Sequence, residues 1–506
     1  MKMIKSLILG SAAGLIAVGG AQAADLPLKA KAVEYVRICS LYGAGFYYIP
    51  GTDTCIKLGG YLRAEVAVNT NSVYTGNTSG AGGANNRFTN AYTWRSREDL
   101  NIDTRTATEY GVVRTYFDAT FTWTTGGYAG SGTTAYDANN PAGTGSGQVA
   151  GGALGVYYAF IQFAGFTMGK AISQFSAPWS NYPGNIYDGL VGGGGTVTGV
   201  NQFTYTADFG NGVSGTISAQ DQVAYYQAGV NNLGFGGAFG FGTSDYAGTA
   251  TPDFVGVLKV DQAWGLIQLS VAAHDNHVAY YGSLGELSGH PDDKWGFAVQ
   301  GALSIKNIPT GVGDVINVQG VYTDGATRYN IQDLAGSAGA NTIYSGSGVL
   351  GAYQSVGFGF APDSVFGVGG EQQLVQTWGM RGGYTHNWYP FWNTSIYGAF
   401  ASVHYNGEAK DLMCGPGGVG GTIQRALGAG VTSCNPDYNI AQLGMITRWT
   451  PVKNLTFAAD FAYTHLDQKM AGTINAANAG IGKPPAVYEL KDQDTYQLLI
   501  RAQRNW

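Results

Sequence analysis

The sequence predicts an all-β fold, a transmembrane antiparallel β-barrel of about sixteen strands. Apolar and polar residues alternate with a period of two along many segments, which is typical of strands with one apolar and one polar face. Short and long connections between these segments alternate along the chain. No apolar run after the N-terminal leader reaches the roughly 18 residues that a membrane-spanning helix needs, so strands would have to make any membrane crossing.

The N-terminus, residues 1–23, has the features of a secretory signal peptide. Two lysines precede an apolar run, and small residues lead up to Ala23. The run is too short to anchor the chain in a bilayer, so we expect cleavage after Ala23 and export. We expect residues 24–55 to form a segment on the periplasmic side and residues 56–506 to form the barrel as a single domain.

The composition narrows the function classes. The 506 residues include 80 Gly and 33 Tyr, only 12% are charged, and the formal net charge is -6. This modest acidity argues against a nucleic-acid partner, which would favour a basic surface. Abundant Gly and Tyr suit the turns, loops and interface aromatics of an outer-membrane barrel, although a Gly-rich secreted adhesin would share them.

The C-terminal segment, residues 494–506, shows the alternation most clearly. One face holds Tyr496, Leu498, Ile500, Ala502 and Trp506, with Arg504 as an exception, and the other holds Thr495, Gln497, Arg501, Gln503 and Asn505. In a barrel wall the apolar face points to lipid and the polar face to the lumen. From this strand alone, a half-buried strand of a soluble sandwich fits equally well.

The other segments with this character set the strand count. They are residues 56–69, 92–105, 110–122, 153–164, 166–174, 199–209, 213–221, 253–261, 264–274, 294–305, 314–323, 374–385, 393–405, 438–449 and 455–466. Short turns join alternate pairs, whereas the opposite connections run to dozens of residues. A soluble sandwich has no reason to sort its connections in this way, but a barrel with periplasmic turns and extracellular loops does.

Two neighbouring predicted strands share a strongly charged face. The charged residues are Arg95, Arg97, Asp99, Asp103 and Arg105 on the first strand, and Arg114 and Asp118 on the second. Apolar residues occupy the opposite face of each. Because the core of a soluble protein cannot hold this many charges, the charged face must be in contact with water.

The stretch from Cys39 to Arg63, shortly after Ala24-Asp25-Leu26-Pro27, resembles the N-terminus of the alphaproteobacterial porin family. The resemblance extends to residues 91–105, the turn at 165–170 and the final strand. It implies a general-diffusion porin, a homotrimer set among outer-membrane lipid and lipopolysaccharide. One departure is Trp506, since porins usually end in Phe, but an aromatic end is kept.

The loop from Phe175 to Thr198 follows the fifth predicted strand, the position from which a constriction loop folds inward in the porins that this chain resembles. Prolines stiffen it, and Asp188 gives it a negative charge. We expect it to face a basic wall across the lumen, and the opposed charges to select solutes. The expected pore-lining residues are Arg63, Arg95, Arg97, Asp99, Asp103, Arg105, Arg114, Asp118 and Asp188. Alternatively, Asp188 lies on an outward-facing loop and the arginines only pair with the aspartates.

Four cysteines in an exported chain allow three disulfide pairings. Local pairing, Cys39 with Cys55 and Cys414 with Cys434, is the simplest, and each closed loop would confer about 3 kcal/mol. Free thiols remain an alternative. Metal ligation is not favoured, because neither pair shows the short ligand spacing of a zinc site.

Nothing in the sequence indicates catalysis. The six histidines form no metal-ligand array, and no nucleophile elbow is visible, so we expect no catalytic residue, metal or cofactor. Gly192 to Gly195 lack the Lys-Ser/Thr of a phosphate cradle and are interpreted as a flexible loop. We therefore expect a channel in the outer membrane for passive diffusion of small hydrophilic solutes and ions. The alternatives are an outer-membrane β-barrel enzyme, which would hydrolyse lipid or peptide, and a Gly-rich secreted adhesin, which would be soluble without detergent.

Overall fold

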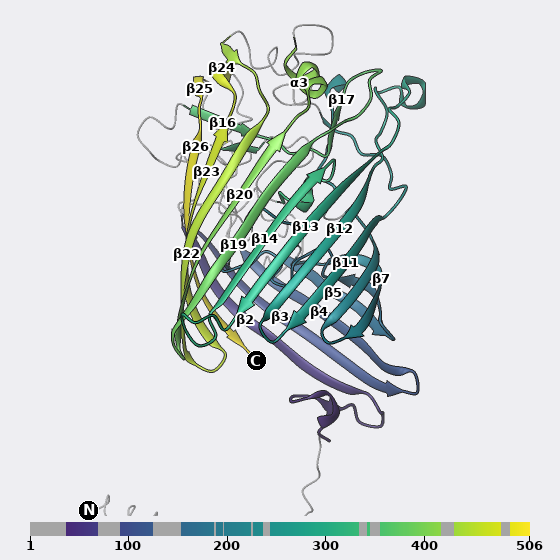
Figure 1. Ribbon diagram of the computed structural model, residues 1–506, viewed down its shortest axis with the longest axis vertical. Coiled ribbons are helices and arrows are strands. Elements are labelled where there is room, and N and C mark those ends of the chain that lie inside the picture. Colours follow the sequence, from purple (N-terminus) through teal and green to yellow (C-terminus); the bar gives the residue numbers. More distant parts are fainter. Residues whose placement is uncertain are drawn as a thin grey trace, which may run out of the picture.

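The fold is described from a computed structural model (Figure 1). The structure describes residues 37–68, 92–124, 153–186, 189–195, 197–223, 226–235, 243–332, 342–344, 355–415, 430–476 and 486–506. The expected signal peptide, residues 1–23, and Asp188 lie outside the described residues.

Sixteen long strands of the described chain close into an antiparallel barrel. They are β2 (Cys55–Val68), β3 (Tyr92–Thr108), β4 (Gly111–Thr124), β5 (Ala153–Phe163), β6 (Phe166–Ala171), β7 (Val200–Gly210), β8 (Val213–Gln220), β11 (Asp253–Gln262), β12 (Gly265–Asn276), β13 (Lys294–Lys306), β14 (Val315–Asp324), β19 (Gln376–Tyr389), β20 (Trp392–His404), β22 (Tyr438–Val452), β23 (Leu455–Gln468) and β26 (Gln493–Asn505). Each pairs with its successor, and β26 pairs with β2 from Tyr61 opposite Asn505 to Val68 opposite Leu498. The predicted barrel is confirmed, and every predicted strand falls on one of these.

The barrel wall is apolar outside and polar inside. Exposed outward side chains include Leu62, Phe121, Leu258, Ile396 and Leu443, whereas inward polar side chains such as Ser270, Gln300, Gln319, Thr377 and Gln442 are buried. This polarity is the reverse of a soluble domain, so the sandwich alternative is wrong. The two-residue period that predicted the strands produces it directly, since successive side chains point to opposite faces.

The two ends of the barrel differ, as Figure 1 shows. Short hairpins lie at one end, here called the turn end, together with the C-terminus. One of them has Asn211 and Gly212 at φ angles of 52° and 76°, the left-handed conformation that a tight two-strand turn needs. Long connections gather at the other end, here called the loop end.

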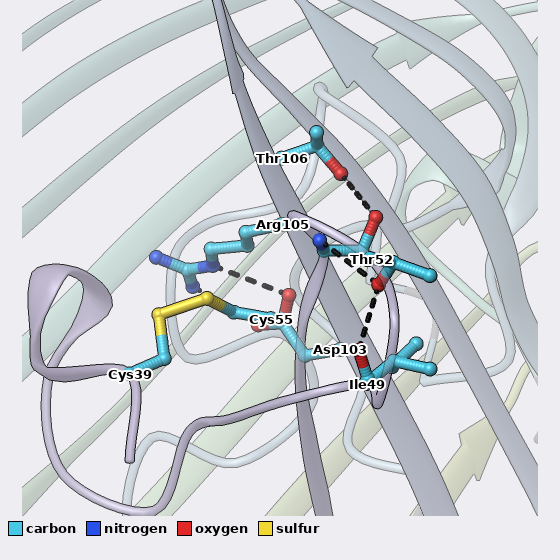
Figure 2. Close-up of a disulfide and its surroundings, with 8 residues drawn as sticks. Cys39, Ile49, Thr52, Cys55, Asp103, Arg105 and Thr106 are labelled. Atoms are coloured by element: carbon cyan, nitrogen blue, oxygen red, sulfur yellow. Dashed lines mark hydrogen bonds and ion pairs between the residues drawn. A yellow bond between two sulfur atoms is a disulfide. The ribbon is translucent and has the colours of Figure 1, made fainter. Parts of the chain in front are cut away.

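The N-terminal segment is fastened to the turn end. It contains η1 (Ser40–Tyr42) and β1 (Tyr47–Tyr48), and the disulfide Cys39–Cys55 closes it (Figure 2). Phe46 is buried beside this disulfide, with the Arg105 guanidinium 4.9 Å from the centre of its ring. The segment is therefore held against the start of the β2–β3 wall.

The long connections at the loop end are folded rather than plain loops. One small sheet joins β10 (Thr243–Ser244), β9 (Val230–Asn232), β17 (Ser364–Phe366) and β18 (Gln373–Leu374), and another joins β15 (Thr342–Tyr344), β16 (Ser355–Gly359), β25 (Ala486–Leu490), β24 (Ala471–Ala476) and β21 (Val431–Ser433). Short helices are η2 (Leu233–Phe235), η4 (Gly285–Ser288), η5 (Thr327–Tyr329) and α3 (Gly407–Cys414). The second disulfide joins Cys414 to Cys434. Within the described residues, no helix is long and apolar enough to span a membrane.

Asp363 ties several of these connections together. Its buried carboxylate accepts hydrogen bonds from the backbone N–H groups of Ala228 (2.8 Å) and Thr327 (2.6 Å) and from the hydroxyl of Tyr246 (2.8 Å). A buried carboxylate needs such donors to offset its lost hydration. The connections after β8 and β14 are thereby locked to each other over the barrel.

Candidate pore constriction

The connection between β6 and β7 folds into the barrel. Phe175, Leu190 and Val191 on it are no more than 2% exposed, although no strand or helix contains them. Gln300 donates to the Phe175 carbonyl (2.8 Å), and Gln442 accepts from the Val191 N–H (2.9 Å). The connection is therefore packed against the inner face of the wall that runs from β13 to β22.

Arg381 on β19 fastens this connection in place. Its guanidinium donates to the carbonyls of Ser180 (2.6 Å), Leu190 (3.0 Å) and Gly194 (3.4 Å). The side chain is only 1% exposed, so these carbonyls replace the water that the charge has lost. Arg448 on β22 acts similarly toward the carbonyl of Gly184 (2.6 Å).

The glycine run 192–195, expected to be a flexible loop, is instead packed closely against the wall. A Cβ on Gly192 would lie 2.2 Å from the Met380 carbonyl, and one on Gly193 would lie 1.9 Å from the Gln319 amide nitrogen. Gly192 also has a φ of +88°, which glycine adopts without strain. These glycines let the backbone approach the wall, so the flexible interpretation was wrong.

Charged residues face the lumen in cross-strand rows where β26, β2 and β3 pair. One row is Arg501, Glu65 and Arg95, and the next is Gln503, Arg63 and Arg97. In the first row Glu65, whose side chain is 0% exposed, forms ion pairs with both arginines. In the second row the central position holds Arg63 instead of a carboxylate.

The structure brings five of the predicted site residues together. Arg63, Arg95, Arg97, Asp99 and Asp118 line one recess of about 300 Å³, whose other walls include Tyr157, Tyr158, Tyr182 and Ile186. Because Tyr182 and Ile186 belong to the inward-folded connection, this recess lies between that connection and the β2–β4 wall.

The other predicted site residues lie apart from this recess. Asp103 accepts from the guanidinium groups of both Arg105 (2.9 Å) and Arg114 (3.0 Å), next to the N-terminal segment. For Arg105 and Arg114, the alternative interpretation is therefore correct, since both arginines form ion pairs with an aspartate. Asp188 falls outside the described residues, so its place opposite the arginines remains a prediction.

Sequence reasoning missed several residues of the site: Glu65, Arg381, Arg448, Asp460 and Arg501. Tyr182 and Ile186 belong to the loop that was expected to fold inward. The sequence pattern puts Arg501 on the polar face of the C-terminal strand, and its neighbours on adjoining strands could have indicated a shared row. Asp460 accepts from the Ile186 N–H (2.8 Å), a contact between residues 274 positions apart. No local pattern indicates such a contact.

Comparison with known proteins gives a consistent result. A family model described as the porin subfamily matches residues 25–499. Porin Omp2b of Brucella canis is 33% identical over 310 residues, covering 60% of this chain and 75% of that protein, and Omp2b of Brucella melitensis is 32% identical over the same extent. The outer membrane channel DcaP of Acinetobacter baumannii superposes with a TM-score of 0.56 at 14% identity, covering 91% of this chain and 99% of that chain, a likeness of fold alone.

Proposed function

The chain belongs to the porin subfamily, and on that premise we propose that it forms a water-filled channel for passive diffusion of small hydrophilic solutes and ions across the outer membrane. The observation that carries the proposal is the reversed polarity of the closed sixteen-stranded barrel, apolar toward lipid and polar toward the lumen. A barrel of this size leaves an aqueous channel when nothing fills it.

The inward-folded connection sets the effective bore. Since Arg381, Arg448 and Gln442 hold it against the β13–β23 side, the remaining passage runs along the β26–β4 side. Solutes would pass the recess residues Arg63, Arg95, Arg97, Asp99 and Asp118 there. Asp103, Arg105 and Arg114 would line the passage nearer the turn end.

We propose that Asp188 faces this arginine-rich wall and sets up a transverse field with it. The support is local: Ile186, two positions before Asp188, accepts a hydrogen bond from Arg501 at 2.9 Å. Charges this close across a narrow bore are only partly screened, because the Debye length is about 8 Å at physiological salt. The field would bias which ions enter.

Orientation and assembly are further parts of the proposal. We place the turn end with residues 24–55 in the periplasm and the loop end outside, facing lipopolysaccharide. We also propose a homotrimer, which rests on the resemblance to porins. Cross-linking of the protein in native outer membranes should give a three-copy band, and a single-copy band at all cross-linker concentrations would contradict it.

We assign the chain no catalytic activity. The support is that the relatives are porins. Purified, folded protein incubated with phospholipid or peptide should release no product. Turnover that survives repurification would instead support the outer-membrane enzyme.

Liposome swelling tests the diffusion proposal. Vesicles containing the folded protein should swell in isotonic sugar at rates that fall as sugar size increases, because the bore sieves by size. Vesicles with heat-denatured protein are the control. Equal swelling of vesicles with folded and with heat-denatured protein would contradict passive general diffusion. A swelling rate that saturates as the concentration of one particular sugar rises, but not with other sugars, would contradict it too.

A further inference from the structure

A second recess, here called the arginine recess, lies beside the first. It has a volume of about 300 Å³, and the two recesses share Arg63, Tyr182, Ile186 and Arg501. Three of its lining residues, Arg63, Arg448 and Arg501, are cations, and none of its lining residues is a carboxylate.

Arg63 has unused hydrogen-bond donors in this recess. Its Nε donates to Gln503 Oε1 (2.9 Å), and its guanidinium stacks over the Tyr61 ring at 4.4 Å. Within the described part of the chain, its two terminal nitrogens have no hydrogen-bond or ion-pair partner. Arg501 donates from Nε to Glu65 and from one terminal nitrogen to the Ile186 carbonyl. Within the described residues, its other terminal nitrogen also has no hydrogen-bond or ion-pair partner.

The nearby carboxylates are already engaged. Glu65 is 0% exposed at its side chain and lies between Arg95 and Arg501. Asp460 is also fully buried, and its oxygens accept from the Tyr397 hydroxyl (2.5 Å) and the Ile186 N–H (2.8 Å). Asp99 and Asp118 line the neighbouring recess, which also contains Arg63 and Arg501, but no carboxylate of the described residues lines the arginine recess itself. The surface of this recess is therefore positively charged.

We propose that the arginine recess is a binding subsite for small organic carboxylates. Guanidinium donors match the two oxygens of a carboxylate, and such charge-assisted bonds are about twice as strong as neutral ones. The side chains of Ile186 and Ala458 give the recess an apolar side for the body of the solute, and Asn505 and Thr456 add neutral polar groups. The proposal rests on the proposed channel function, since the solute reaches the recess through the lumen.

Block of single-channel current by benzoate tests this subsite. At neutral pH benzoate is a carboxylate with an apolar body, and benzamide is its uncharged analogue of similar shape. Benzoate should reduce the potassium chloride current at concentrations at which benzamide does not. In Arg63→Gln the concentration for half block should rise about tenfold, because one charge-assisted contact is lost.

Two further variants separate the subsite from general effects. Gln503→Glu keeps Arg63 but replaces the amide that accepts from Arg63 Nε with a carboxylate. This carboxylate would pair with Arg63 in place of benzoate, so the variant should weaken the block by a similar factor. Arg504→Gln removes an exposed arginine of the same strand that bonds the Lys453 carbonyl outside the recess, and it should leave the block unchanged.

The outcomes distinguish the two proposals. Protein that folds but opens no channel in potassium chloride contradicts the proposed function. The subsite is overturned if benzoate and benzamide affect the open channels equally, or if Arg63→Gln and Gln503→Glu leave the benzoate block unchanged. Either result leaves the proposed channel function intact. Heat-modified gel mobility of each variant shows that it is folded before its currents are compared.

Discussion

Glu65 and Arg501 form a 2.6 Å ion pair that joins β2 to β26, the first and last strands of the barrel, across 436 positions of sequence. Glu65 also pairs with Arg95 on β3, so one carboxylate links three neighbouring strands at the seam. The same charged row forms part of the wall that faces the inward-folded connection. Closure of the barrel and the charge of its passage therefore depend on the same residues.

Glu65→Gln should destabilise the barrel. Its carboxylate is fully buried between two guanidinium groups, and removing one partner of a buried ion pair costs about 3–5 kcal/mol. Denaturant unfolding in lipid vesicles, followed by tryptophan fluorescence, measures the change. Glu371→Gln is the matched control, because Glu371 is 80% exposed and its pair with Lys294 lies at the surface. Equal stability of Glu65→Gln and the parent would contradict the role of the seam.

Arg381→Ala should release the inward-folded connection from the β19 wall. Three backbone carbonyls lose their shared donor, so we expect a larger mean conductance and more current noise than in the parent. Single-channel recording measures both. Lys306→Ala, at an exposed surface pair with Asp261, is the control. A folded Arg381→Ala protein with parental conductance and noise would show that Arg381 does not set the bore.

The ion preference of the passage should depend on Arg97 and Asp188. Arg97→Ala should shift the cation/anion permeability ratio toward cations and Asp188→Ala toward anions, each by about fivefold at most, since one nearby charge contributes about 1 kcal/mol. Reversal potentials in a potassium chloride gradient give the ratio, with Lys453→Ala at the turn end as control. If both variants keep the parental ratio and conductance, the constriction lies elsewhere.

We expect Asp314 to make the turn end sensitive to acid. Burial alone would raise the pKa of this carboxyl, but hydrogen bonds from the Asn387 N–H, Thr310, His386 and Tyr384 outweigh it and hold the pKa well below its usual range. A lowered pKa stabilises the fold above the unfolded value of about 4, and this contribution is lost as the pH falls below it.

Thermal unfolding of Asp314→Asn and the parent across pH tests this role. The variant should unfold at a lower temperature at neutral pH. The gap should narrow below about pH 4, because there the unfolded parent chain binds a proton at this carboxyl that the folded protein does not bind. Asp208→Asn, in an exposed hairpin, is the control. A gap that stays constant down to the lowest pH would show that the charge of Asp314 contributes nothing.

The barrel could be predicted because its signals are local. Alternation such as that along residues 494–506 depends only on neighbouring positions, and so do the short turns that pair the strands. By contrast, the hydrogen bond from Arg381 to the Ser180 carbonyl joins residues 201 positions apart. The hydrogen bond from the Ala228 N–H to the Asp363 carboxylate joins residues 135 positions apart. Which of many inward polar residues meet across the lumen depends on how the connections fold back. The alternating pattern carries no information about that.

Planar-bilayer recording of the purified, refolded chain tests the central claim most directly. A water-filled barrel should insert in discrete current steps in potassium chloride, with current proportional to voltage near zero and conductance rising with salt concentration. Folded protein that shows the heat-modified mobility of a barrel but gives no current steps at any voltage would contradict the channel.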